Sequence, residues 1–147
     1  MQTPTSRRAI TTAYWTATVI ITLAFLSGGA AYVARAEVPL RGMLDLGYPA
    51  YFVTILGIWK ALGGIAILAP RLPRLKEWAY AGIAFDLSGA AFSHAAVGDP
   101  ASKVIVPLVL LGIAVASWTL RPEDRKLRDT KVERAIPRAS AREIRAA

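Results

Sequence analysis

The chain has 147 residues, of which 54% are hydrophobic, and its mean hydropathy is +0.40. This length suits one compact domain, and a soluble domain of that size needs more charge to cover its surface. The charged residues gather at the two ends and in short connections, so that long stretches carry almost none. The composition excludes an ordinary soluble protein and predicts a membrane protein.

Cysteine is absent, and the single histidine is His94. Without cysteine the chain can form no disulfide, no thiol redox centre and no cysteine-ligated metal site. One histidine cannot by itself supply a bis-histidine haem site or a zinc site. We therefore expect no metal site and no autonomous catalysis, and any redox chemistry must come from a bound cofactor or a partner.

Four apolar segments are long enough to cross a bilayer core, which takes about 20 helical residues. They cover residues 10–34, 51–69, 78–96 and 104–120. The first and fourth contain no charged residue, the second contains Lys60, and the third contains Asp86 and His94. We predict four transmembrane helices at these positions.

The first segment has a second interpretation, as a secretory signal. Arg7 and Arg8 precede it, and Ala34-Arg35-Ala36 imitates a cleavage site. The apolar part of a signal peptide usually has roughly 7 to 15 residues, fewer than this segment has. We favour a transmembrane helix.

The connection over residues 37–49 is predicted to contain a short helix. Pro39 suits the first turn, and Leu40, Met43, Leu44 and Leu46 supply an apolar face. An irregular loop with scattered hydrophobic residues is the alternative. The predicted fold is therefore an all-α, four-helix transmembrane bundle, with a short outer-surface helix between the first and second spans.

Basic residues predict the orientation. Fourteen lysines and arginines lie before the first span, between the second and third spans, or after Leu120, whereas three lie in the other two connections. Basic connections stay on the cytoplasmic side. We expect a multi-pass protein of the bacterial cytoplasmic (inner) membrane with both termini in the cytoplasm.

The chain divides into a transmembrane domain, residues 1–120, and a basic cytoplasmic tail, residues 121–147. The tail holds nine basic and five acidic residues. Because acids are mixed in and aromatic residues are lacking, we expect no nucleic acid as a partner. Proximity to anionic lipid headgroups of the bilayer is the better expectation.

Lys60 and Asp86 lie near the middle of the second and third spans. At the centre of a membrane helix each charge costs about 2.5 to 3.5 kcal/mol, so such residues normally find a partner inside the bundle. Adjacent antiparallel helices place the two at matching depth, and we predict an ion pair. It either fixes the helix register or forms part of a polar pocket; a third interpretation leaves Lys60 without a partner.

Small residues share a helical face with each of these charges. The two faces are Gly82, Asp86, Gly89 and Ser93 on the third span, and Gly57, Lys60, Ala61 and Gly64 on the second. Because small residues let membrane helices approach closely, we predict a tight packing seam between these two spans. Glu77 is interpreted as a first-turn acid that favours the helix dipole, and His94 as a hydrogen-bonded interfacial residue.

Two runs resemble the DoxX-like family of small bacterial membrane proteins. The longer, residues 70–94, reads PRLPRLKEWAYAGIAFDLSGAAFSH, and the shorter reads LGYPAYF, followed by LGIWK and Gly63. The resemblance covers residues 14–122 and implies a four-helix membrane bundle. It implies site candidates at Lys60, Glu77, Trp78, Tyr80, Asp86, Ser93 and His94. The family's namesake is associated with a thiosulfate:quinone oxidoreductase, and other relatives with redox-stress complexes or detoxification of quinones and catechols.

Three functions remain open. The first is a subunit that binds a small aromatic ligand, such as a quinone, near Asp86 and His94 with Phe85 and Phe92 close by, and that supports an oxidoreductase subunit. The second is a structural scaffold or assembly chaperone with no ligand. The third is a small-molecule or proton-coupled transporter. A homo-oligomer is compatible with all three.

Overall fold

The structure, a computed structural model, describes residues 4–127. Within that range the chain is helical and has no strand. The helices are α1 (Pro4–Val33), α2 (Glu37–Asp45), α3 (Ala50–Leu68), α4 (Pro73–Ala96), α5 (Ala101–Thr119) and the 3-10 helix η1 (Glu123–Arg125). The all-α prediction is confirmed, and so is the short helix between the first two long ones. Most of the predicted tail, residues 128–147, lies outside the described residues.

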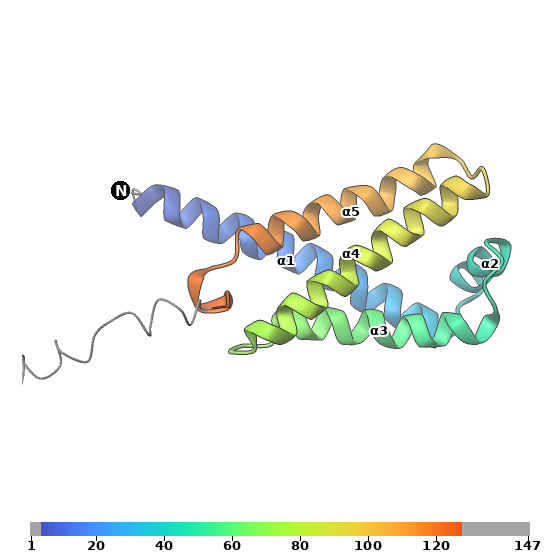
Figure 1. The fold of residues 1–147 in the computed structure, drawn as a ribbon, viewed down its shortest axis with the longest axis horizontal. Coiled ribbons are helices and arrows are strands. Elements are labelled where there is room, and N and C mark those ends of the chain that lie inside the picture. Colours follow the sequence, from blue (N-terminus) through green and yellow to red (C-terminus); the bar gives the residue numbers. More distant parts are fainter. Residues whose placement is uncertain (1–3, 128–147) are drawn as a thin grey trace, which may run out of the picture.

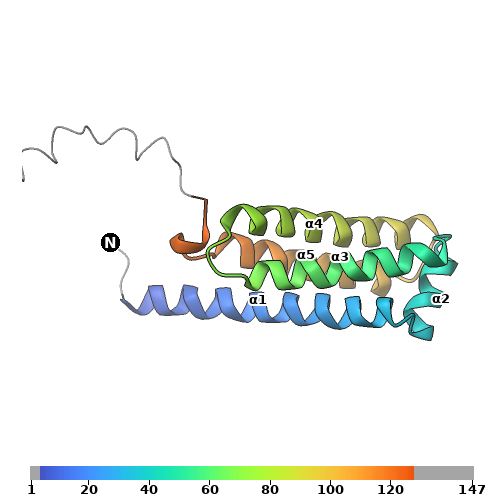
Figure 2. The same cartoon turned by 90° about the horizontal axis from the view of Figure 1, so that it is seen from below.

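Four long helices form the bundle (Figure 1). Helix α1 packs along α3 and also contacts α5, while α4 packs on α5 and α3. The N-terminus of α1, the α3–α4 turn and the end of α5 lie at one end of the bundle, which we call the turn end. Helix α2 and the α4–α5 connection lie at the other, the α2 end (Figure 2).

Three helices are long and apolar enough to cross a membrane: residues Ser6–Val33 of α1, Ala50–Leu68 (α3) and Ala101–Thr119 (α5). Helix α4 has 24 residues, about 36 Å of helix, so its length also suffices. It is less apolar because Arg74, Lys76, Glu77 and Asp86 interrupt it. The structure therefore identifies three apolar spans.

Helix α4 begins at Pro73, five residues before the expected start at Trp78. Proline fits the first turn of a helix, since its missing N–H would have no partner there in any case. The sequence-based boundary was wrong because it followed the loss of hydrophobicity at Lys76 and Glu77, whereas the backbone stays helical through both.

The core of the bundle is formed by buried side chains from all four long helices. They are Ile21, Phe25, Ile67, Tyr80, Ile83, Leu87 and Ala114. Burying one such large apolar side chain stabilises a soluble fold by about 1.5 to 3 kcal/mol. In a bilayer, where lipid is equally apolar, the same residues contribute mainly through close packing.

Candidate functional site: a groove between α3 and α4

Lys60 of α3 and Asp86 of α4 meet between the two helices. The Lys60 Nζ donates to Asp86 Oδ2 over 2.5 Å, and the side chains are 16% and 12% exposed. A charge-assisted hydrogen bond of this kind is among the strong ones that side chains form. The structure thus brings together the two residues that the sequence singled out as costly inside a membrane.

Two aromatic rings of α1 lie close to the ammonium group of Lys60. Its Nζ lies 4.6 Å from the centroid of the Phe25 ring and 5.7 Å from that of Tyr32. A ring face attracts a cation, and the attraction strengthens where water is scarce. The ammonium group is therefore held by a carboxylate from one side and by the faces of two rings of α1.

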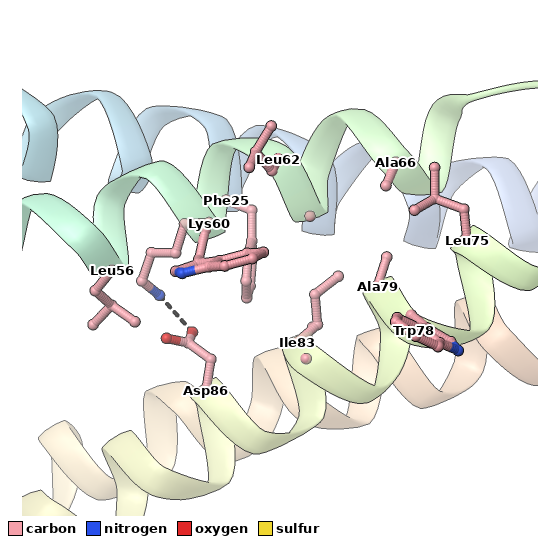
Figure 3. A pocket seen from close by; sticks show the side chains of 13 residues that line it. Phe25, Leu56, Lys60, Leu62, Ala66, Leu75, Trp78, Ala79, Ile83 and Asp86 are labelled. Atoms are coloured by element: carbon pink, nitrogen blue, oxygen red, sulfur yellow. Dashed lines mark hydrogen bonds and ion pairs between the residues drawn. The ribbon is translucent and has the colours of Figure 1, made fainter.

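A groove of about 460 Å³ extends from this ion pair toward the turn end (Figure 3). We call it the α3–α4 groove. It is lined by Phe25 of α1, by Leu56, Trp59, Lys60, Leu62, Gly63 and Ala66 of α3, and by Leu75, Trp78, Ala79, Gly82, Ile83 and Asp86 of α4. Its walls are mostly apolar, and the ion pair supplies the only charged side chains among its lining residues.

The predicted tight seam between α3 and α4 is wrong. A Cβ added at Gly57 would lie 2.7 Å from Tyr32 Cβ, and one at Gly29 would lie 2.8 Å from the Gly57 carbonyl oxygen. Both contacts join α3 to α1. On α4, a Cβ at Gly82 or Gly89 would meet nothing within 4 Å. Periodicity identified the small-residue faces, but it could not say which neighbouring helix each face contacts.

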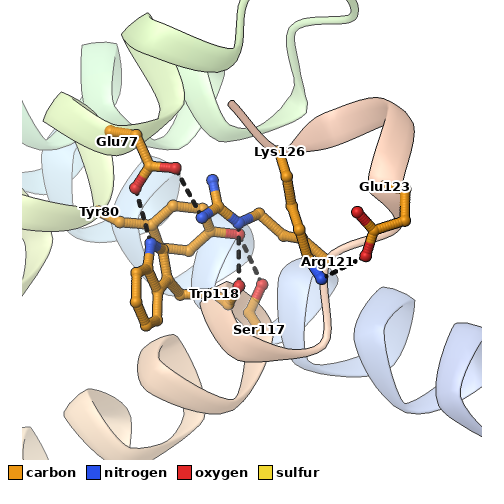
Figure 4. Close-up of polar contacts among 7 residues, drawn as sticks. All are labelled: Glu77, Tyr80, Ser117, Trp118, Arg121, Glu123 and Lys126. Atoms are coloured by element: carbon orange, nitrogen blue, oxygen red, sulfur yellow. Dashed lines mark hydrogen bonds and ion pairs between the residues drawn. The ribbon is translucent and has the colours of Figure 1, made fainter. Parts of the chain in front are cut away.

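Glu77 and Tyr80 lie outside the groove, in a polar cluster between α4 and α5 near the turn end (Figure 4). The Glu77 carboxylate accepts from Trp118 Nε1 over 2.8 Å and from Arg121 Nη2 over 2.7 Å. The Tyr80 and Ser117 hydroxyls are 2.7 Å apart. Glu77, Tyr80 and Trp118 border a hollow of about 280 Å³ that is smaller than the groove.

The first-turn interpretation of Glu77 is also corrected. Because α4 begins at Pro73, Glu77 is its fifth residue, and the first turn holds no acid. The electrostatic partner of Glu77 is Arg121, whose side chain is 4% exposed. The sequence-based prediction placed Arg121 in a basic cytoplasmic tail near lipid headgroups, since nothing in a single sequence shows that the chain turns back after α5.

Ser93 and His94 lie at the α2 end. The Ser93 hydroxyl is 2.8 Å from the Tyr48 hydroxyl, and His94 Nδ1 is 2.7 Å from Asp99 Oδ2. Lys103 Nζ donates to the other oxygen of Asp99 over 2.9 Å. Hydrogen bonds from Lys103 and then from His94 hold the pKa of Asp99 below its usual value. These contacts join the α2–α3 and α4–α5 connections to the bundle.

The candidate residues therefore divide into three places. Lys60, Trp78 and Asp86 line the α3–α4 groove, whereas the expected neighbours Phe85 and Phe92 are 78% and 75% exposed and do not line it. Phe25 and Trp59 also line the groove, although neither was predicted as a site residue. Trp59 precedes Lys60 directly, a signal that could have been used; Phe25 lies in a uniformly apolar helix that offers none.

These features define a class: a helical membrane protein whose apolar groove contains one ion pair. A family model for the DoxX-like family matches residues 16–117. The match covers more than half of the chain and includes α3 and α4 in full and the larger part of α1 and α5, so the chain belongs to the DoxX-like family. Comparison with curated proteins gave no match, and comparison with solved structures gave none either.

Proposed function

We propose that this DoxX-like protein binds a small, mostly apolar aromatic ligand in the α3–α4 groove, as an accessory subunit of a quinone-linked membrane redox system. The observation that carries the proposal is the groove itself, about 460 Å³ with a single ion pair in its wall. Ligand sites are commonly apolar hollows of about 300 to 1,000 Å³ with a few placed polar groups.

The ion pair suits such a ligand chemically. The Lys60 ammonium can donate a hydrogen bond to a ring carbonyl oxygen, and the Asp86 carboxylate can accept one from a ring hydroxyl. A quinone presents the first group and its reduced form the second. The pair would bind and orient the ring, and electrons would have to pass to and from a partner oxidoreductase, since the chain has no cysteine.

The proposal includes a membrane arrangement. Helix α4 is the fourth span, because it lies between α3 and α5 in the bundle and has sufficient length for a bilayer core. Three of its charged residues have partners within the protein, which reduces their cost in lipid: Asp86 pairs with Lys60, Glu77 with Arg121, and Lys76 Nζ donates to the Ile67 carbonyl oxygen. With the basic connections inside, the turn end faces the cytoplasm of an inner membrane.

A purely structural role is the second candidate, and a specific observation favours it. Lys60 already has Asp86 and two aromatic rings as partners, so the ion pair is satisfied without a ligand. In that case the pair fixes how α3 and α4 sit together, and lipid chains fill the groove. Ligand binding must therefore be measured directly.

Two glycines provide a matched experiment. Gly82 lines the groove, whereas Gly89 lies two turns further along α4 and does not line it. An added Cβ would meet nothing within 4 Å at either position. Gly82→Leu should fill the groove without disturbing the fold, and Gly89→Leu is the control. Titration with a decyl-substituted benzoquinone, followed by tryptophan fluorescence, should show at least tenfold weaker binding for Gly82→Leu only. Equal binding by all three proteins, or none by any, supports the scaffold.

A further inference from the structure

The groove is open along its side, between α3 and α4. Four large apolar residues around it are well exposed: Trp59 at 67%, Leu62 at 50%, Leu75 at 46% and Trp78 at 80%. All four lie in the middle or turn-end parts of two helices that pack around the bundle core. In a bilayer this surface faces hydrocarbon, and large exposed apolar side chains match that surrounding.

Three features border the other sides of the groove. Phe25 of α1 forms its back wall, and the Lys60–Asp86 pair bridges the two helices in the part of the groove toward α2, next to Leu56 (Figure 3). At the turn end, α3 and α4 are joined by a connection of only four residues, 69–72, which keeps them close together.

The groove also has a direction. On α3 its lining runs from Leu56 to Ala66, about 15 Å of helix, and the ion pair lies in the half of that length nearer to α2. The part toward the turn end is lined by Ala66, Leu75 and Ala79. A ligand that matches this pattern has a hydrogen-bonding group at one end and an apolar extension at the other.

We propose that the groove takes its ligand sideways from the lipid phase, and that the ligand is a membrane-dissolved amphiphile bound with its polar ring at Lys60 and Asp86 and its apolar chain toward the turn end. This inference rests on the proposed function, because it assumes that the groove binds a ligand. It goes further by setting aside freely water-soluble ligands such as simple catechols.

Single cysteines can test the entry route, because the chain has no native thiol. Gly82→Cys places a thiol in the groove, Gly89→Cys places one on α4 outside it, and Val38→Cys places one on α2, where Val38 is 82% exposed. Full-length variants in phospholipid vesicles are treated with a lipid-soluble maleimide or with a charged thiosulfonate that stays in water. The probe ligand is a fully ring-substituted decyl benzoquinone, which does not alkylate thiols.

If the ligand enters sideways, Gly82→Cys should react with the maleimide. With the thiosulfonate, Gly82→Cys should react at least tenfold more slowly than Val38→Cys. The decyl quinone should slow labelling of Gly82→Cys several-fold and leave Gly89→Cys unchanged, while catechol at equal concentration protects neither. Thiosulfonate labelling of Gly82→Cys at the rate of Val38→Cys overturns lateral entry. Lateral entry is also overturned if Gly82→Cys reacts with neither reagent while Gly89→Cys reacts. If the labelling rates are as expected but the decyl quinone does not slow them, ligand binding is refuted, while the access to the groove from the lipid is supported.

Discussion

Removing one charge of the Lys60–Asp86 pair should destabilise the protein, and removing both should cost much less than the sum. Breaking a buried ion pair costs about 3 to 5 kcal/mol in soluble proteins, and one charge in a membrane helix about 2.5 to 3.5 kcal/mol. The two side chains retain 16% and 12% exposure, so we take the lower part of these ranges. Asp86→Asn keeps an acceptor oxygen for Lys60 and should cost about 2 kcal/mol, whereas Lys60→Met should cost about 3 kcal/mol.

The double variant leaves no uncompensated charge, so a coupling energy of about 2 kcal/mol is expected, equivalent to roughly thirtyfold in the unfolding equilibrium. Reversible unfolding of the purified protein in mixed micelles, titrated with a denaturing detergent, measures all four free energies. Additivity of the two single changes to within about 0.5 kcal/mol would show that Lys60 and Asp86 do not interact, because residues that meet over 2.5 Å cannot act independently.

Three further changes test other parts of the structure by the same unfolding measurement. Gly29→Ala should cost about 1 to 3 kcal/mol, because its Cβ would lie 2.8 Å from a carbonyl oxygen of α3. Gly28→Ala is the control and should cost nothing, since its Cβ would have nothing within 4 Å. Equal effects of the two changes would contradict the close α1–α3 contact. Asp99 has a lowered pKa in the folded protein, so its contribution to stability is complete above its unfolded pKa of about 3.9 and is lost as the pH falls below that value. Asp99→Asn should remove this part of the loss of stability at low pH. An unchanged dependence of stability on pH in the acid range would refute this prediction. Arg121→Met should cost about 1 to 3 kcal/mol, because it removes the cation that pairs with Glu77, whose side chain is 27% exposed. A change under about 0.5 kcal/mol would show that Arg121 belongs to a solvated tail.

Hydrophobicity was sufficient to place the long helices, because a bilayer requires long apolar segments and leaves few alternatives. The predicted segments 51–69 and 104–120 agree with α3 (Ala50–Leu68) and α5 (Ala101–Thr119) to within a few residues. Where polar residues enter a helix, hydrophobicity fails as a guide. This is why α4 was predicted to start at Trp78 rather than Pro73.

The candidate site was predicted in part. Lys60 and Asp86 stand out because a charge in a membrane span needs a partner, and opposite signs at matching depth allow only a few pairings. The residues around them depend on helix rotation, which a weak amphipathic pattern does not define. Hence Phe85 and Phe92 were expected near the ligand but point away from the bundle, while Phe25 of α1 forms the back wall.

Ligand binding in the α3–α4 groove can be tested on the small molecules that stay with the protein when it is purified from its own membrane. Wild type, Gly82→Leu and Gly89→Leu would be extracted with organic solvent and compared by mass spectrometry. We expect a lipophilic aromatic compound, approaching one per chain, in the wild-type and Gly89→Leu extracts, and at least tenfold less of it in the Gly82→Leu extract. Three extracts that contain the same phospholipids and no such compound would contradict this expectation.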